Sequence, residues 1–406
     1  MNLIKMAWRN LWRNRRRTLI TAASLYFAIV FAIMMRSMQL GTYNLMIDSA
    51  VKSYSGYIQI MDSTYWLDKT IDDMMVFDDS VERKITSVPG VVSVLPRLET
   101  FTLISSGTKT KGAMIQGIVP ERDDEMTGMS KHLVDGKYIS SDSKGVVLSS
   151  RLASFLGVTV GDTVVMISQG YHGVSAADQY PVQGILKVPV PTLDNKLVIM
   201  PLNLVRDFTT AEGLVTSVAI NIDDKENMDA VAAALTKTLA GTSLEVLKWT
   251  EMNKVLKQQI EGDNASGIIM LGILYMVIFF GILGTIIMMT SERIREFGVM
   301  TAVGMKRFKI LIMMMLETIL IGIIGLLAGV ITTIPFIVYY MENPIRIGGE
   351  MAKAYEAYGI EPLMGFSGDP LIIINQFYTV LLLMILTLAY PVIKIARLNI
   401  INALRG

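Results

Sequence analysis

The chain contains no cysteine and only two histidines, and this limits the chemistry that it can carry. Without cysteine it can form no disulfide framework, thiolate zinc site or thiol nucleophile. The histidines, His132 and His172, lie far apart in the sequence and do not form a His-Glu-x-x-His pattern. We therefore expect no metal site and interpret both histidines as solvated loop residues.

Recognisable catalytic motifs are also scarce. The sequence shows no paired acids, Ser/His/Asp set or nucleophile elbow in a convincing context. A Gly-x-x-x-x-Gly pattern occurs at residues 107–112, but Ala113 and Met114 follow it where a phosphate-binding loop needs Lys and Ser or Thr. We therefore expect no enzyme activity from this chain alone, no cofactor bound by it and no nucleic-acid partner.

Apolar residues, in contrast, are abundant. They make up 52% of the chain, and the mean hydropathy is +0.47. Each of four runs reaches the roughly 18 apolar residues that a membrane-spanning helix needs. These runs are residues 18–35, 267–290, 310–341 and 371–393. The sequence therefore predicts a membrane protein with four transmembrane α-helices.

The third run contains a single charged residue, Glu317. An ionisable group inside a membrane span is by default a candidate functional residue. An alternative is that Glu317, which lies close to the start of the span, snorkels to the boundary or caps the preceding segment. We favour this alternative, because no chain of acids or histidines accompanies Glu317 to relay protons.

Charge is distributed unevenly around these spans. Residues 1–17 carry six Lys and Arg and no acid, residues 291–309 carry five, and the tail from Lys394 carries three. Residues 342–370 carry two Lys and Arg against five acids. By the positive-inside rule, the first three segments are cytoplasmic and the fourth is outside. Both termini are then cytoplasmic, and residues 41–266 lie on the outer side.

The outer segment has the pattern of a mixed α/β domain, with short strands and Gly/Pro punctuation. Charged helices continuous with the first two spans flank it, so that tilting those spans could move the domain. The first 17 residues place Trp8 and Trp12 on one helical face and Arg on the other, as in an interfacial helix. We interpret the first span as an uncleaved signal anchor.

These observations give the following predicted organisation. It comprises an interfacial helix (1–17), a first span (18–40), a periplasmic α/β domain with helical stalks (41–266), a second span (267–290), a cytoplasmic coupling helix (291–309), a third span (310–341), a periplasmic loop (342–370), a fourth span (371–393) and a cytoplasmic tail (394–406). Small residues that let helices approach closely occur on the second and third spans, and Pro335 lies near the end of the third. These small residues are Gly281, Gly284, Gly322, Gly325 and Gly329.

Residues 291–310, "SERIREFGVMTAVGMKRFKI", have charged ends around a short apolar core. The core is long enough for about two turns of helix, and such a helix could dock into a groove of a soluble partner. A plain positive-inside loop would need only a few Lys and Arg, so the patterned Glu and Gly favour the docking helix.

Within this segment, "REFGVMTAVG" resembles the Arg-Glu-Ile-Gly…Ala-x-Gly motif of the FtsX-like permeases, the membrane subunits of ABC transporters of the MacB and lipoprotein-releasing (Lol) type. Phe297 replaces the commoner Ile. The resemblance extends over nearly the whole chain, from "AWRNLWRNRRRTLIT" through "MLETILIGIIGLLAG" to "ARLNIINALRG", which lacks the usual Pro near Ile400. Outer-domain segments such as "LGVTVGD" resemble those of the Lol permeases.

The resemblance implies a role for the 291–309 segment as the coupling helix that contacts a cytoplasmic ATPase. It places the ATPase contacts at Glu292, Arg293, Arg295, Glu296, Phe297, Gly298, Gly304 and Lys306. ATP and Mg²⁺ would be bound by that partner, an ATPase dimer, and a second permease chain, identical or paralogous, would complete the complex. No catalytic residue is expected in this chain.

The function implied by this resemblance is release of lipoproteins from the bacterial inner membrane to a periplasmic carrier. Two alternatives remain open. One is MacB-type efflux of peptides, macrolides or toxins with a periplasmic adaptor. The other is an FtsX-like regulator of cell-wall hydrolases, which the large outer segment disfavours.

Overall fold

The computed structural model describes residues 3–13, 15–51, 55–357 and 361–397. The chain divides into two compact units. The helical unit contains residues 1–44, 259–345 and 363–406, and the α/β unit contains residues 45–258 and 346–362. Most of the predicted cytoplasmic tail, including Ile400, lies outside the described residues.

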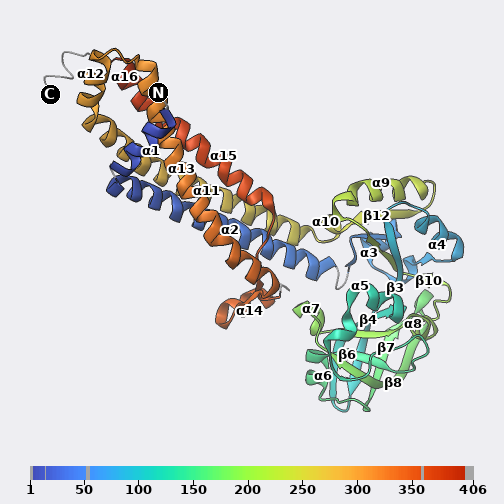
Figure 1. The fold of residues 1–406 in the computed structure, drawn as a ribbon. Coiled ribbons are helices and arrows are strands. Elements are labelled where there is room, and N and C mark those ends of the chain that lie inside the picture. Colours follow the sequence, from blue (N-terminus) through green and yellow to red (C-terminus); the bar gives the residue numbers. More distant parts are fainter. Residues whose placement is uncertain (1–2, 14, 52–54, 358–360, 398–406) are drawn as a thin grey trace. The chain divides into compact units, whose positions relative to one another are not determined.

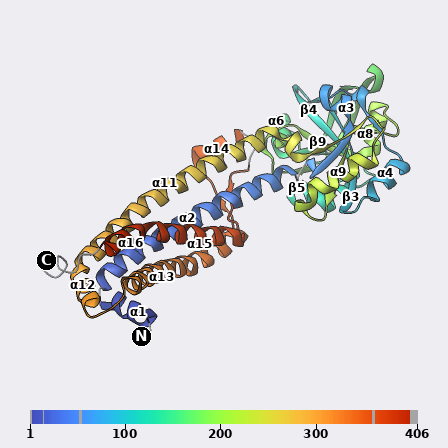
Figure 2. The ribbon, with the colours of Figure 1, turned by 90° about the horizontal axis from the view of Figure 1, so that it is seen from above.

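Long apolar helices build the helical unit (Figures 1 and 2). In the described part of the chain, four helical segments are long and apolar enough to cross a membrane, in agreement with the predicted runs. The short helices α1, α12 and α16 lie at the same end of this unit (Figure 1). Its helices are α1 (Leu3–Arg13), α2 (Arg15–Ala50), α11 (Lys254–Glu292), α12 (Ile294–Ala302), α13 (Arg307–Glu342), α15 (Pro370–Thr387) and α16 (Ala389–Ala396).

Glycines on α13 allow it to pack closely against α2. A Cβ added at Gly325 would lie 2.8 Å from Leu25 Cβ, and one at Gly329 would lie 2.8 Å from Ile29 Cγ2. Any larger residue would therefore force the two helices apart, as expected for small residues at membrane helix contacts. Pro335 lies within α13 without ending it.

Gly281 and Gly284 of α11 behave differently. A Cβ added at either would meet no heavy atom of the described chain within 4 Å. Of the glycines singled out in the sequence, those of α13 therefore pack against other helices of this chain, whereas these two lie on the mostly exposed apolar stretch of α11.

The α/β unit is built around a ten-stranded mixed sheet with the order β12-β1-β11-β3-β4-β9-β6-β8-β5, and β7 pairs with β3 and β8. The pairs β4–β9 and β6–β8 are parallel, and the other pairs are antiparallel. Long β3 joins the two halves of the sheet, because its first part pairs with β11 and its second part with β4 and β7. The strands are β1 (Ile58–Asp62), β3 (Val91–Ser106), β4 (Lys109–Ile118), β5 (Leu133–Gly136), β6 (Val146–Ser149), β7 (Thr163–Gln169), β8 (Ser175–Leu186), β9 (Leu197–Pro201), β11 (Ser217–Ile222) and β12 (Leu244–Lys248).

Short helices and two small strand pairs complete the elements. The pairs are β2 (Met75–Val76) with β10 (Leu214–Val215), and β13 (Ile345–Arg346) with β14 (Leu363–Met364). The helices are α3 (Ser63–Asp68), α4 (Asp79–Thr86), α5 (Pro120–Thr127), α6 (Ser150–Leu156), α7 (Pro191–Asp194), α8 (Leu202–Thr209), α9 (Met228–Thr238), α10 (Trp249–Met252) and α14 (Gly349–Ala357). The predicted mixed α/β character of this segment is therefore observed.

The "LGVTVGD" segment is a tight connection between α6 and β7. Gly157 ends α6 with a φ of 75°, and Gly161 has a φ of 97°, a conformation that favours glycine. Asp162 Oδ2 accepts hydrogen bonds from the backbone N and the hydroxyl of Thr159, at 2.7 and 3.0 Å. These hydrogen bonds lower the pKa of Asp162. This motif therefore has a structural role in turning the chain.

A buried ion pair fixes α5 to β3. Arg97 Nε donates to Asp123 Oδ2 at 2.9 Å, and both side chains are almost fully buried. Arg97 lies where β3 passes from one half of the sheet to the other. A buried guanidinium needs a carboxylate partner, because a lone charge at low dielectric is strongly unfavourable.

We therefore expect Asp123→Ala to lower the free energy of unfolding by about 3–5 kcal/mol, since it leaves Arg97 without its carboxylate. The matched control is Glu82→Ala, which removes a more exposed pair with Arg122 and should cost about 1 kcal/mol or less. Thermal unfolding of the full chain in detergent, followed by circular dichroism, measures both. Equal small losses in the two variants would contradict a structural role for the buried pair.

Candidate functional site

The predicted coupling segment folds into a short helix between two long ones. Helix α11 ends at Glu292, α12 runs from Ile294 to Ala302, and α13 begins at Arg307. Gly304, with a φ of 99°, makes the turn between α12 and α13. Phe297 anchors α12, because its fully buried ring packs with Ile310, Met313, Met314 and Ile395.

A buried ion pair joins this segment to the membrane helix that follows it. Arg293 Nη1 donates to Glu317 Oε2 at 2.5 Å, and the side chains are only 5% and 2% exposed. The second carboxylate oxygen, Oε1, accepts a hydrogen bond of 2.7 Å from Asn10 Nδ2 of α1. The guanidinium carbon of Arg293 also lies 5.2 Å from the centre of the Phe297 ring. Three helices from distant parts of the sequence therefore meet at one carboxylate.

Two further ion pairs surround the buried one. Arg13 Nη2 lies 2.7 Å from Glu296 Oε2, and Arg17 pairs with Glu292. Both pairs are partly exposed, so each contributes about 1 kcal/mol or less to stability. Their contribution is geometric, because they place the α1–α2 region beside the junction of α11 and α12.

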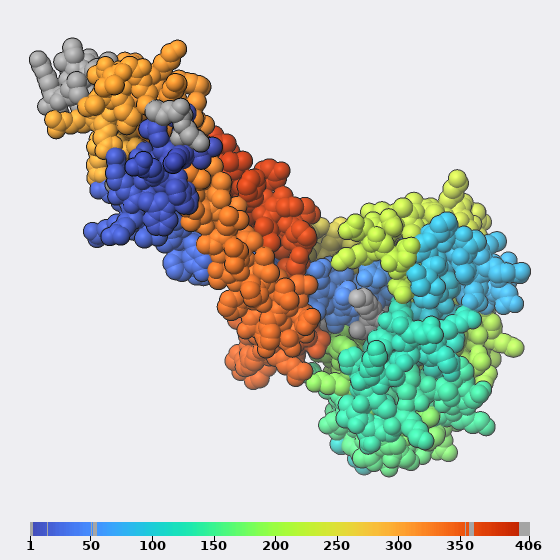
Figure 3. Space-filling view, viewed as in Figure 1, coloured from blue at the N-terminus to red at the C-terminus, as the bar shows by residue number. Residues whose placement is uncertain are grey.

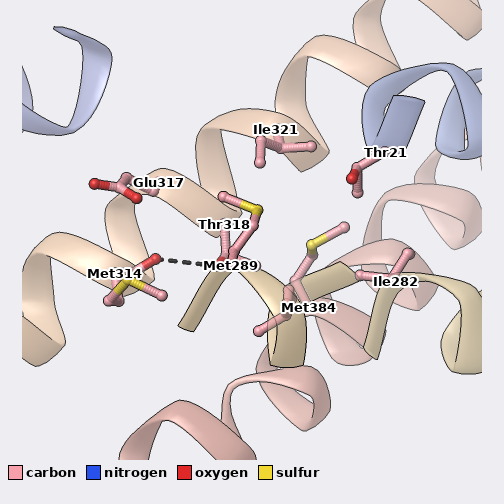
Figure 4. A pocket seen from close by; sticks show the side chains of 9 residues that line it. Thr21, Ile282, Met289, Met314, Glu317, Thr318, Ile321 and Met384 are labelled. Carbon is pink, nitrogen blue, oxygen red and sulfur yellow. Dashed lines mark hydrogen bonds between the residues drawn. The ribbon is translucent and has the colours of Figure 1, made fainter. Parts of the chain in front are cut away.

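Glu317 lies at the edge of a small gap among α2, α11, α13 and α15 (Figure 4). The gap has a volume of about 10 Å³. Such a volume holds about one water molecule at most. This part of the helical unit is therefore closely packed. The gap is lined by Thr21, Ile282, Ile286, Met289, Met314, Glu317, Thr318, Ile321 and Met384.

The structure sorts the predicted ATPase-contacting residues into two groups. Arg293, Phe297 and Gly298 are buried within the chain, whereas Glu292, Arg295, Glu296, Gly304 and Lys306 are exposed. Arg293, predicted from the sequence to be among the ATPase contacts, is buried and directs its guanidinium to Glu317 of the same chain. Among the exposed residues, Glu292 and Glu296 are paired with arginines of the same chain.

Glu317 contacts the start of the coupling segment through Arg293. It does not snorkel to the surface, since it is 2% exposed and bound to Arg293.

Sequence reasoning missed three residues of this site, namely Asn10, Arg13 and Arg17. Their partners lie about 275 to 307 positions away in the chain, so no local spacing could reveal the contacts. The amphipathic pattern of residues 1–17 was the available signal, because it placed a polar helix face at the same side of the membrane as the coupling segment.

The exposed apolar side chains near α12 were also missed. Val303 is 84% exposed, and Val299 and Phe308 are about half exposed or more. Because the exposure of large apolar side chains to water is unfavourable, these residues mark a surface suited to binding a partner.

A second polar cluster joins α2 and α11 toward their other ends. Arg36 Nη1 donates to Asn264 Oδ1 at 2.6 Å and to Gln39 Oε1 at 2.8 Å. Gln39 Nε2 donates to the backbone oxygen of Asp263, and the Tyr43 hydroxyl donates to Asp263 Oδ2 at 2.5 Å. The two helices that lead to the α/β unit are therefore cross-linked by side-chain hydrogen bonds.

The buried ion pair makes a stability prediction. We expect Glu317→Leu and Arg293→Met each to cost about 3–5 kcal/mol, since each removes the buried ionic partner of the other residue and leaves only the longer contact with Glu296 or the hydrogen bond from Asn10. We expect the double variant to recover much of that loss. Thermal unfolding of the purified full chain in detergent gives the double-mutant cycle. As a control, Arg13→Ala should change stability by about 1 kcal/mol or less. Additive losses in the double variant would contradict direct pairing.

Comparison with known proteins places both parts of the chain in one family. A family model described as the MacB-like periplasmic core domain matches residues 18–238. A second model, described as the FtsX-like permease C-terminal, matches residues 268–400. These matches confirm the resemblance drawn from residues 295–304.

Individual relatives agree with this result. The chain is 24% identical over 330 residues to the lipoprotein-releasing system transmembrane protein LolC of Xylella fastidiosa, and the match covers 78% of each chain. It is 21% identical over 249 residues to the LolC protein of Neisseria meningitidis serogroup B, with 60% of each chain covered.

Among solved structures, the periplasmic region of MacB from Actinobacillus actinomycetemcomitans aligns with 53% of this chain and 95% of its own, at 16% identity and a TM-score of 0.36. The family assignment depends on the sequence matches, and the periplasmic-core match alone takes up more than half of the chain. The protein therefore belongs to the FtsX-like ABC transporter permeases that carry a MacB-like periplasmic domain.

Proposed function

We propose that this permease transmits the motion of a cytoplasmic ATPase to its periplasmic domain, and that this motion releases lipoproteins from the bacterial inner membrane. The observation that carries the mechanical part is the buried cluster of Asn10, Arg293 and Glu317. Because this cluster binds the α12 segment to α1 and α13, α12 cannot shift without moving the membrane helices or breaking a buried ion pair.

The transmission route follows the contacts within the helical unit. A push on α12 acts on α13 through Glu317, and α13 packs on α2 through Gly325 and Gly329. Helix α2 is bound to α11 through the cluster that includes Arg36 and Asp263. Both α2 and α11 continue as unbroken helices into residues of the α/β unit. Tilting of these helices is then the motion that reaches the periplasmic domain.

The ATPase would contact the exposed surface around α12. The exposed side chains of this surface include the apolar Val303 and Phe308 and the cations Arg295 and Lys306. Such a composition suits docking into an apolar groove with an acidic rim. ATP and Mg²⁺ would be bound, and ATP hydrolysed, by that partner.

We expect the double charge reversal Arg295→Glu with Lys306→Glu to weaken ATPase binding at least about tenfold, equivalent to ~1.4 kcal/mol, because both cations would face the acidic rim. Co-purification from membranes and ATPase stimulation in detergent measure the effect. The matched control is Arg346→Glu with Lys353→Glu, which reverses two cations in the segment predicted to lie on the opposite side of the membrane. Unchanged binding and stimulation in the α12 variant would refute this docking surface.

Lipoprotein release is supported by the two LolC proteins to which the chain is similar. A lipoprotein held in the membrane by its acyl chains needs mechanical work to leave it, since each buried CH₂ contributes about 0.8 kcal/mol to anchoring. A periplasmic carrier would receive the released lipoprotein. The mostly exposed face of α11, with Gly281 and Gly284, supports pairing with a second permease chain.

Depletion of this protein in its own host tests the substrate. We expect acylated lipoproteins destined for the outer membrane to accumulate in the inner membrane, because their extraction would stop. Fractionation of the two membranes and quantification of acylated lipoproteins measure this, with an integral inner-membrane protein as the control for fraction purity. An unchanged lipoprotein distribution would reject lipoprotein release and leave the ABC permease assignment intact.

Efflux of peptides, macrolides or toxins with a periplasmic adaptor is the second candidate. The observation that favours it is the match of residues 18–238 to the MacB-like periplasmic core domain. Export assays in the same depletion strain test this candidate. Loss of export together with normal lipoprotein sorting would support efflux.

A further inference from the structure

An apolar crevice lies in the helical unit between α2, the last third of α13 and the start of α15. Its volume is about 300 Å³. The α13 residues that line it lie between positions 334 and 341. Helix α12 lies before the other end of α13, which begins at Arg307. Since an α-helix rises about 1.5 Å per residue, the crevice lies some 40 Å along α13 from the coupling segment. It is therefore separate from the ATPase-facing site.

The crevice has a buried floor and an open mouth. Ile33, Ile337 and Ile372 form the floor and are 0%, 6% and 4% exposed. Ile334, Val338 and Met341 line the mouth and are about half exposed. The floor and the mouth are therefore aliphatic, and the opening is on the outer surface of the helices.

One end of the crevice is polar and held firmly. Ser37 Oγ donates to the backbone oxygen of Ser367 at 2.7 Å, and the Ser367 N–H donates to the Ser37 backbone oxygen at 2.8 Å. Asp369 caps α15 by accepting from the Leu371 N–H at 2.8 Å. A Cβ added at Gly41 would lie only 2.3 Å from the Phe366 backbone, so this segment lies directly against α2. The crevice is therefore a fixed part of the fold.

The solvent around these helices decides what fills such a crevice. All three helices are long and apolar enough to span a membrane, so a mouth on their outer surface is open to the lipids that would surround them. An apolar cavity of about 150 Å³ takes up benzene, which has six carbons, so a crevice of twice that volume holds on the order of a dozen carbons of a chain. A polar end beside an aliphatic interior also matches the order of groups along a membrane lipid.

We propose that this crevice binds a single hydrocarbon chain of a membrane lipid, with the headgroup toward Ser367 and Asp369. The chain fills the space over Ile33, Ile337 and Ile372 and so completes the packing among α2, α13 and α15. This site does not depend on lipoprotein release, because any lipid with a linear acyl chain satisfies its chemistry. The proposed occupant is an acyl chain of a phospholipid, because phospholipids make up the bilayer that these helices are able to span. The acylated end of a lipoprotein is the other source, and the test distinguishes it.

Photolabelling of the full-length protein in nanodiscs tests the proposal. One sample contains a phospholipid with a diazirine on one acyl chain, and a second contains a diacylated lipopeptide with the same diazirine chain. Mass spectrometry then locates the labels after irradiation. We expect labels on Ile337 and Ile372, which are buried and can be reached only by a chain inside the crevice. The internal control is Val380 and Leu383, equally or nearly as buried on α15 but away from the crevice.

A matched pair of variants sharpens the test. Ile373 lines the crevice, and its neighbour Ile374 does not. We expect Ile373→Trp to reduce labelling of Ile337 by about tenfold, since the larger side chain occupies the space, and Ile374→Trp to leave it unchanged. Labelling by one probe alone identifies the source of the chain. Labelling of Ile337 and Ile372 no stronger than that of Val380 and Leu383, with both probes, would overturn the proposal.

Discussion

The buried ion pair between Arg293 and Glu317 is the constraint on which the end of the helical unit around α12 depends. A guanidinium and a carboxylate that are both shielded from water must remain paired, since separating them leaves two uncompensated charges. The apolar anchor Phe297 could accept small shifts, because apolar contacts have little directionality. The ion pair and the hydrogen bond from Asn10 have strict distances and angles, so they define one position of α12 relative to α1 and α13.

Helix α2 connects the other long helices along the rest of the helical unit. It contacts α13 through Gly325 and Gly329, where close approach makes the contact rigid, and it contacts α11 through hydrogen bonds of Arg36 and Tyr43. The first contact relies on shape and the second on directional polar groups. Polar contacts at low dielectric are costly to break without replacement. Motion that entered through α12 and α13, as the proposed function requires, would therefore be shared by α2 and α11 rather than absorbed between them.

Much of the architecture could be predicted because it depends on local sequence. Long apolar runs, basic flanks and the Gly and Asp of "LGVTVGD" each act within a few residues, and the structure agrees with them. The contacts of Glu317 could not be predicted, because Asn10 and Arg293 approach it only after the helices pack. The glycines show the same limit. Gly325 and Gly281 look alike in sequence, yet only Gly325 faces a neighbouring helix of this chain.

The placement of charge around α12 also changes the expected character of the ATPase contact. The sequence offered four charged residues at the start of this segment as partners for another protein. Arg293 is used within the chain, and Glu292 and Glu296 are neutralised by Arg17 and Arg13. The acids at this surface are thus balanced internally. What remains exposed for a partner is a set of apolar side chains and cations. Under the proposed function, specificity would come from shape and from the sign of the rim charge, and the buried ion pair would pass the applied force to α13.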